Sequence, residues 1–166
     1  VIHTFMVPKL LAARPHARLV FMVRDGRDVV ASMKTRKYAF TGLDDLIASW
    51  TLANAVMLEL RDRPGTILVR YEDLVRQPEV TLRRICDTLG EAFAPEMMRP
   101  ESGLIELNGF QPTDKVGVLG DRSSHGRLRA WQINQPLFDG SGRWRTELDA
   151  GEKRRVKELA QSQLIA

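Results

Sequence analysis

A cluster of cationic and hydroxyl side chains follows a short apolar run near the start of the chain. Residues Leu19 to Val23 read LVFMV, and residues Arg24 to Arg36 read RDGRDVVASMKTR. This order predicts a strand, a tight polar turn and a helix. Such an arrangement holds a phosphate at a helix N-terminus, where free N–H groups and the helix dipole favour negative charge. The sequence therefore indicates an anion site at this turn, and an enzyme that uses a nucleotide cofactor is a candidate.

Arg24, Ser32 and Arg36 are the residues that we expect to contact the phosphate. Arg24 is the first residue beyond the predicted strand, and ligands of open α/β sheets lie beyond the carboxyl ends of the strands. Ser32 and Arg36 are four positions apart and therefore share one helix face. Each charge-assisted hydrogen bond would contribute about 1.5–3 kcal/mol. The structural alternative stays open: Arg24 would pair with Asp28, Ser32 would pack as a small residue, and Arg36 would be solvated.

Strands and helices that alternate along the chain would position this turn. We expect buried parallel strands over Arg18–Val23 and Thr66–Arg70, because both are short apolar runs rich in β-branched residues. Helices are expected over Phe5–Ala13, Asp28–Arg36, Leu43–Arg61, Val80–Leu89 and Gly151–Leu164. The pattern predicts an α/β fold with a parallel sheet. Two strands make a thin sheet, so we expect that part of it is missing from this chain.

The apolar faces of these helices and the caps at their ends can be read in the same way. The residues expected to face the core are Phe5, Met6, Leu10, Leu11, Leu46, Ile47, Trp50, Leu52, Val56, Leu60, Val156, Leu159 and Ala160. Asp25 or Asp28 is expected to cap the helix that follows the turn. Gly90 is expected to end the helix over Val80–Leu89.

Composition sets broad limits on the fold and the partners. The chain has 166 residues, 43% hydrophobic and 28% charged, which fits a single domain over residues 1–166. Residues 95–142 are rich in Gly, Ser, Pro, Asn and Asp, and we expect an irregular, mobile segment that covers substrate or cofactor. A net charge of +4 favours anionic ligands. The interleaved charges and an aromatic content of 7% argue against a nucleic-acid partner.

Other features bear on compartment and cofactor type. Cys86 is the only cysteine, so an internal disulfide is excluded and a reducing, cytoplasmic location is expected. We expect Cys86 to be a buried helical residue. No stretch approaches the ~18 apolar residues of a membrane span. We find no cluster of metal ligands and predict no metal, and the oligomeric state is left open.

The motifs resemble those of sulfotransferases that use 3′-phosphoadenosine 5′-phosphosulfate (PAPS). The resemblance rests on VRDGRDVVASM at residues 23–33, on Trp50, and on VRYEDLVRQPEVTLRRICDTLG at residues 69–90. It is strongest to the tyrosylprotein sulfotransferases, in which VRDGR, SM and TRK recur at this spacing. The resemblance implies a P-loop-NTPase-like fold, in which helices flank a parallel sheet in three layers. It also implies that Arg24, Ser32 and Arg36 bind the 3′-phosphate and that Tyr71 lines the nucleotide pocket, although Tyr71 could equally be a half-buried aromatic at a strand end.

The resemblance resumes over residues 132–148. Within this range QPLFDGSGRWRTEL is similar to a C-terminal segment that closes over the cofactor in many bacterial members. By this likeness Arg143 and Trp144 hold the nucleotide; the alternative makes Trp144 a docking anchor and Arg143 a surface charge. In the tyrosylprotein enzymes a serine and a lysine from this region approach the transferring sulfuryl group. Ser123 or Ser124 would be the serine, and Gln135 stands at the lysine position, which puts tyrosylprotein specificity in doubt.

The family's P-[KR]-[ST]-G-[TS]-[TS] loop, which cradles the 5′-phosphosulfate, has no counterpart, since no glycine precedes Gly26. The chain also does not begin with Met. We therefore expect the C-terminal two-thirds of a domain that moves a sulfuryl group from PAPS to an acceptor hydroxyl, with protein tyrosine and carbohydrate both open. The alternatives are a truncated, inactive nucleotide-binding remnant and a P-loop-class kinase. Against a kinase, the sequence does not contain the G-x-x-x-x-G-K-[ST] motif of that class.

Overall fold

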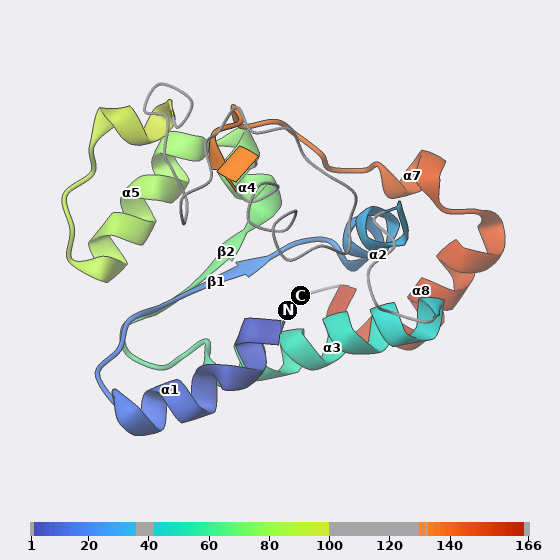
Figure 1. Cartoon of the computed structure of the whole chain (residues 1–166), viewed down its shortest axis with the longest axis horizontal. Helices are drawn as coiled ribbons and strands as arrows, with labels where there is room; N and C mark the ends of the chain where they lie inside the picture. Colours follow the sequence, from blue (N-terminus) through green and yellow to red (C-terminus); the bar gives the residue numbers. More distant parts are fainter. Residues whose placement is uncertain (1, 36–41, 100–129, 132, 165–166) are drawn as a thin grey trace. The chain divides into compact units, whose positions relative to one another are not determined.

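The computed structural model describes residues 2–35, 42–99, 130–131 and 133–164 (Figure 1). The chain divides into two compact units, one formed by residues 1–91 with 139–166 and the other by residues 92–138. The elements of the first unit are η1 (Ile2–Met6), α1 (Val7–Ala13), β1 (Leu19–Val23), α2 (Gly26–Thr35), α3 (Leu43–Leu60), β2 (Thr66–Arg70), α4 (Tyr71–Arg76), α5 (Pro78–Leu89), α7 (Trp144–Glu147) and α8 (Ala150–Leu164). The second unit contains η2 (Pro95–Met98).

The two strands of the first unit lie side by side and run parallel (Figure 1). Their register pairs Leu19 with Thr66 and continues to Val23 with Arg70. The carboxyl ends of both strands therefore reach the same edge of the sheet, where α2 and α4 begin. The expected α/β architecture with parallel strands is confirmed.

One face of β1 packs against helices, and the other does not. Leu19 and Phe21 are buried and form a core cluster with Val7 of α1 and Met57 of α3. Val20 and Met22 point the opposite way and are 39% and 46% exposed. The prediction of a strand buried on both faces was therefore wrong for β1. A continuous apolar run indicates that both faces can be covered, but it does not supply the element that covers them.

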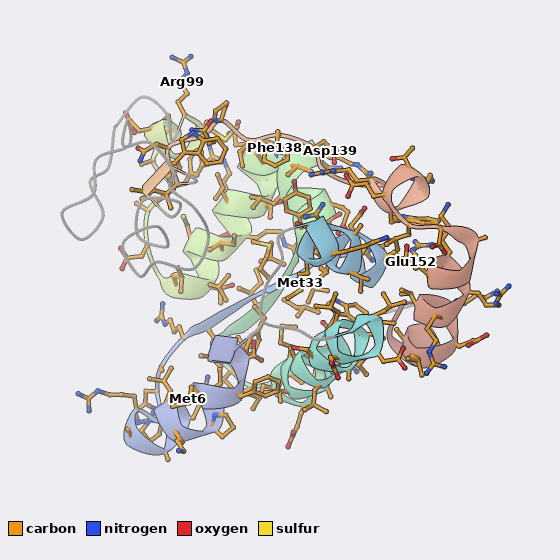
Figure 2. The ribbon with its side chains drawn as sticks, turned by 45° about the vertical axis from the view of Figure 1, so that its right-hand side comes forward. Met6, Met33, Arg99, Phe138, Asp139 and Glu152 are labelled. Carbon is orange, nitrogen blue, oxygen red and sulfur yellow. The ribbon has the colours of Figure 1, made fainter. Side chains whose placement is uncertain are left out.

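A second core joins α2, α3 and α8. Its most deeply buried members are Val30, Ala31, Ile47, Val156 and Ala160. Polar contacts at the surface link the same helices. Lys34 of α2 pairs with Glu152 of α8 at 2.7 Å. Glu152 is labelled in Figure 2. Arg155 of α8 pairs with Asp44 of α3 at 2.6 Å.

The structure corrects several expected core positions. Leu52, Leu159 and Leu10 are 60%, 41% and 46% exposed, although the sequence predicted that they face the core. The same prediction was wrong for Phe5 and Met6, which are 39% and 52% exposed. In α3 the buried positions are instead Leu46, Ile47, Trp50, Ala53, Asn54 and Met57. These six follow the spacing of one helix face, which passes through a polar asparagine and leaves the leucine at position 52 on the far side. In the N-terminal helix the break between η1 and α1 rotates the register, so that Val7 is the buried residue.

The observed ends of the helices and strands agree more closely with the ends predicted from the sequence. β2 has the expected bounds, and α5 ends at Gly90, which adopts the left-handed conformation at φ 68°. Cys86 is buried in α5, as expected. The helix after the turn begins earlier than predicted, at Gly26 instead of Asp28. Within the described residues, no helix combines the length and apolar character needed to cross a membrane.

The start of α2 packs closely on Trp50 of α3. A Cβ atom placed on Gly26 would lie 2.9 Å from Cε2 and from Cζ2 of the indole. The indole Nε1 donates a hydrogen bond to the Arg24 carbonyl at 3.2 Å, which fixes the ring beside the turn. Trp50 is only 6% exposed, so it has little room to move. This contact sets the distance between the turn and α3.

We expect Gly26→Ala to lower the free energy of unfolding by about 1–3 kcal/mol, because the added methyl group overpacks a rigid buried ring. Chemical denaturation followed by circular dichroism would measure the change. Gly151→Ala in α8 is the matched control: it lies in a helix, where alanine is favoured over glycine by up to about 1 kcal/mol. Identical unfolding midpoints for Gly26→Ala and the wild type would contradict the expected steric role of Gly26.

Candidate functional site

Arg24 emerges from the carboxyl end of β1 and is partly buried. Its Nη2 donates to the carbonyl of Gly140 at 2.5 Å, and its guanidinium carbon lies 4.5 Å from the centre of the Tyr71 ring. Its Nε is buried and has no hydrogen-bond partner in the described structure. A buried N–H without an acceptor costs about 1–3 kcal/mol, so this geometry is suited to a ligand that supplies one.

The partners of Arg24 differ from those of its neighbouring arginines. Arg27 forms an ion pair with Asp25 at 2.6 Å, and Arg143 donates through Nε to Glu147 at 2.7 Å. The charges of Arg27 and Arg143 are therefore compensated by carboxylates. The two contacts described for Arg24 are a carbonyl and an aromatic ring, and both are neutral. Its positive charge is thus held in place without being neutralised.

Asp25 organises the turn that follows Arg24. Its Oδ1 accepts from the Arg27 backbone N–H at 2.9 Å, so Asp25 fulfils the capping role expected of Asp25 or Asp28. Burial alone would raise the pKa of Asp25, but hydrogen bonds from the Arg27 side chain and backbone outweigh it, and the pKa lies below its ordinary value of 3.8. The carboxylate is therefore ionised at neutral pH.

Glu72 connects the two strand ends. It is the second residue after β2 and is 8% exposed, and its Oε1 accepts from the Asp25 backbone N–H at 3.0 Å. This hydrogen bond joins the β1–α2 turn to the start of α4. It holds the neighbouring Tyr71 at the edge where Arg24 emerges.

Residues 139–144, here called the 139–144 segment, return to this edge from the C-terminal part of the chain. Asp139, labelled in Figure 2, pairs with Arg76 of α4 at 3.7 Å. The Gly140 N–H donates to the Tyr71 hydroxyl at 3.1 Å. Asp28 accepts from the N–H of Gly142 at 2.7 Å and from that of Trp144 at 3.0 Å. Side chains that follow both strands, Arg24 among them, thus contact one segment.

Trp144 is enclosed by cations. The guanidinium carbons of Arg27 and Arg145 lie 4.0 and 5.0 Å from the centre of the indole, and Lys153 Nζ lies 6.0 Å away. The ring also packs against the core of α2, α3 and α8. These contacts favour the alternative in which Trp144 is a docking anchor, and Arg27 takes part in them through a cation–π contact.

The remaining residues singled out from the sequence lie in different places. Ser32 is half-buried in α2. Arg36, Ser123 and Ser124 lie outside the described residues. Gln135 belongs to the second unit, where its side-chain amide donates to the Trp131 carbonyl at 3.1 Å.

A cavity of about 220 Å³ opens at the carboxyl ends of the strands. Its lining includes Arg24, Asp25 and Gly26 from the turn, Arg70 and Glu72 from the end of β2, and residues of α3 and α5. In parallel sheets this edge is where ligands bind.

Sequence reasoning missed two residues on which this site depends, Gly26 and Glu72, and gave Asp28 a different role. Asp28 was taken as a cap of its own helix or as a partner of Arg24, whereas both of its oxygens accept from the 139–144 segment. The available signal was that Asp28 lies five residues after β1 and Glu72 two residues after β2, which places both carboxylates near one sheet edge. Their partners could not be read from spacing, since one pair is separated by 114 positions.

Comparison with known proteins shows the family to which this chain belongs. The model described as "Sulfotransferase family" matches residues 2–95, more than half of the chain. The chain belongs to the sulfotransferase family. A protein-tyrosine sulfotransferase of Drosophila melanogaster is 30% identical over 155 residues, an alignment that covers 88% of this chain and 29% of that protein.

Two solved structures share the fold. The sulfotransferase domain from the curacin biosynthetic pathway superimposes with a TM-score of 0.57 at 20% identity, over 87% of this chain and 53% of that one. Retinol dehydratase in complex with androsterone and the inactive cofactor PAP gives a TM-score of 0.56 at 16% identity, over 95% of this chain and 49% of that one. The expected P-loop-like α/β fold of sulfotransferases is confirmed. The chain spans less than a third of the Drosophila protein and about half of each solved chain.

We expect Asp25→Asn to lower the free energy of unfolding by about 1 kcal/mol at pH 7, because it weakens the hydrogen bonds to Arg27. The pKa of Asp25 is lowered by folding, so its contribution is complete above its ordinary pKa of 3.8 and is lost as the pH falls through the folded value. The difference between the variant and the wild type should therefore shrink from pH 7 to pH 3, as measured by urea denaturation at each pH.

Asp62→Asn serves as the control, because it removes the same charge from a side chain that is 88% exposed. It should leave stability unchanged over this range. A difference between Asp25→Asn and the wild type that stays constant down to pH 3 would contradict the role assigned to the Asp25 carboxylate.

Proposed function

We propose that this chain binds the 3′-phosphate end of PAPS and forms part of an enzyme that transfers the sulfuryl group to an acceptor hydroxyl. The observation that carries the proposal is Arg24, whose uncompensated charge and unpartnered buried Nε lie at the carboxyl end of β1. A phosphate oxygen would satisfy this N–H with a charge-assisted hydrogen bond. Membership of the sulfotransferase family and the family resemblance of the Arg24–Ser32 spacing support the same assignment.

Ser32, Arg36 and Tyr71 complete the proposed nucleotide set. Ser32 and Arg36 would contact the same phosphate by the family resemblance, and Tyr71 would contribute its ring beside Arg24. The fold shared with retinol dehydratase, a protein solved with PAP bound, also supports binding of a nucleotide by this chain. Arg143 and Trp144 would act on the nucleotide indirectly, because their side chains pair with Glu147 and Arg27 respectively.

Bound PAPS would supply the sulfuryl group, and the residues of this chain would hold and orient it. Sulfuryl transfer requires a base for the acceptor proton and donors that stabilise charge on the transferred group. Arg24 would fix the adenosine end and so limit the motion of the reacting end. By the family resemblance, Ser123, Ser124 and Gln135 are the candidates for contact with the sulfuryl group.

The acceptor class that we propose first is a protein tyrosine, because the Drosophila relative is a protein-tyrosine sulfotransferase. Incubation of the protein with labelled PAPS and either a tyrosine peptide or an oligosaccharide would separate the acceptor classes. A chain that binds the nucleotide but sulfates neither would fit the alternative of an inactive nucleotide-binding remnant.

We expect the wild-type chain to bind adenosine 3′,5′-bisphosphate at least about tenfold more tightly than adenosine 5′-phosphate, which lacks the 3′-phosphate. Arg24→Ala should weaken bisphosphate binding by about 10- to 100-fold, since it removes a charge-assisted hydrogen bond of about 1.5–3 kcal/mol. It should change binding of the monophosphate little. Isothermal titration calorimetry measures both nucleotides under the same conditions.

Arg83→Ala is the matched control, because it removes the same charge from an exposed arginine of α5 that pairs with Glu79. It should bind both nucleotides as the wild type does. Equal affinity of the wild type for the two nucleotides, or an unchanged affinity in Arg24→Ala, would overturn the proposed site.

A further inference from the structure

Asp28 uses its carboxylate in an unusual way for a residue in the first turn of a helix. Such a side chain commonly accepts from N–H groups of its own helix, but Asp25 already performs that role for α2. Both oxygens of Asp28 accept from backbone N–H groups of the 139–144 segment, at 2.7 Å from Gly142 and 3.0 Å from Trp144. Asp28 is only 2% exposed. The carboxylate therefore links the start of α2 to a segment that lies far away in sequence.

This link has a strong physical basis. A buried carboxylate is costly unless hydrogen bonds and nearby positive charge compensate it. Here the two N–H groups and the positive end of the α2 dipole do so. The dependence is mutual, because without the carboxylate the N–H groups of Gly142 and Trp144 lose a charged acceptor. The position of the 139–144 segment thus depends on Asp28.

The same segment determines how Arg24 is held. The Gly140 carbonyl accepts from Arg24 Nη2, and the Gly140 N–H donates to the hydroxyl of Tyr71, whose ring lies against the guanidinium. Gly140 is separated from Gly142 by one residue, so a shift of the segment at Asp28 moves the carbonyl that orients Arg24. The Arg24 Nε remains without a partner in this arrangement.

We propose that Asp28 is a positioning residue of the nucleotide site: it holds the 139–144 segment on α2 so that Gly140 and Tyr71 keep Arg24 turned toward the 3′-phosphate. This inference rests on the proposed function. Asp28 does not touch the nucleotide in this scheme and acts through the segment and Arg24. Its effect should therefore depend on the presence of the 3′-phosphate, which loss of folding alone would not produce.

The first test is Asp28→Asn in the 166-residue chain, since asparagine keeps the shape but places an N–H donor toward one of the two backbone N–H groups. We expect binding of adenosine 3′,5′-bisphosphate to weaken about tenfold, while binding of adenosine 5′-phosphate stays within about twofold of the wild type. Hydrogen exchange should accelerate in residues 139–144 and remain unchanged in β1 and β2. Calorimetry and mass spectrometry give these readouts.

Gly142→Ala tests the same link from the other side, without altering α2. Gly142 has φ +80°, where a Cβ is strained, and its Cβ would also meet the Arg145 side chain. We expect the same selective loss of bisphosphate affinity, and this variant carries the test if Asp28→Asn does not fold. Glu79→Gln is the control: it makes the same change in charge at an exposed pair on α5 and should change neither affinity nor exchange.

The outcomes separate the inference from the proposed function. A wild-type chain that binds both nucleotides equally would overturn the proposed function and this inference with it. A wild-type chain that prefers the bisphosphate, together with variants at positions 28 and 142 that keep the full preference, would overturn the inference alone. Selective loss of the preference in either variant, with faster exchange in the segment, would support it.

Discussion

Parallel pairing of β1 with β2 is the constraint on which the rest of the site depends. The register from Leu19–Thr66 to Val23–Arg70 ends both strands at the same level, so the next residues, Arg24 and Tyr71, emerge side by side. A shift of one residue would turn Leu19 and Phe21 away from Met57 and would separate the guanidinium from the ring. Burial of the apolar face of β1 therefore also fixes the position of the polar groups beyond it.

Carboxylates fix the positions of the polar groups at this edge of the sheet by accepting hydrogen bonds from them. Glu72 accepts from the Asp25 backbone N–H, and Asp25 accepts from the Arg27 side chain. Arg27 in turn stacks on the ring of Trp144, whose backbone N–H donates to Asp28. Each group in this sequence of contacts satisfies the next, so these polar groups pack against the protein core with hydrogen-bond partners, whereas Arg24 Nε has none within the described residues. The Trp50 indole adds a steric limit, because it leaves no space for a side chain at Gly26.

Local features of the fold could be predicted from the sequence, and long-range contacts could not. The bounds of β2, the cap at Gly90 and the burial of Cys86 follow from signals within a few residues. The exposure of Val20, Met22 and Leu52 depends on which elements cover a face, and apolar patterns alone do not contain that information. For the candidate site, the strand–turn–helix pattern predicted that Arg24 follows the end of a strand, and the structure has it directly after β1. The roles of Asp28 and Glu72 depend on chain segments brought together by folding, which residue spacing does not reveal.

The partners of Arg24 explain how an arginine so close to acidic residues can remain available to an anion. Asp25 and Asp28 both follow it within four positions, and either could neutralise it by a direct ion pair. Asp25 is instead engaged by Arg27, and Asp28 by the backbone N–H groups of Gly142 and Trp144. Arg24 is left with a carbonyl and an aromatic face, which orient a guanidinium without cancelling its charge. Under the proposed function, an anion at this edge would not have to displace a carboxylate of the described residues, and the guanidinium charge would attract it directly.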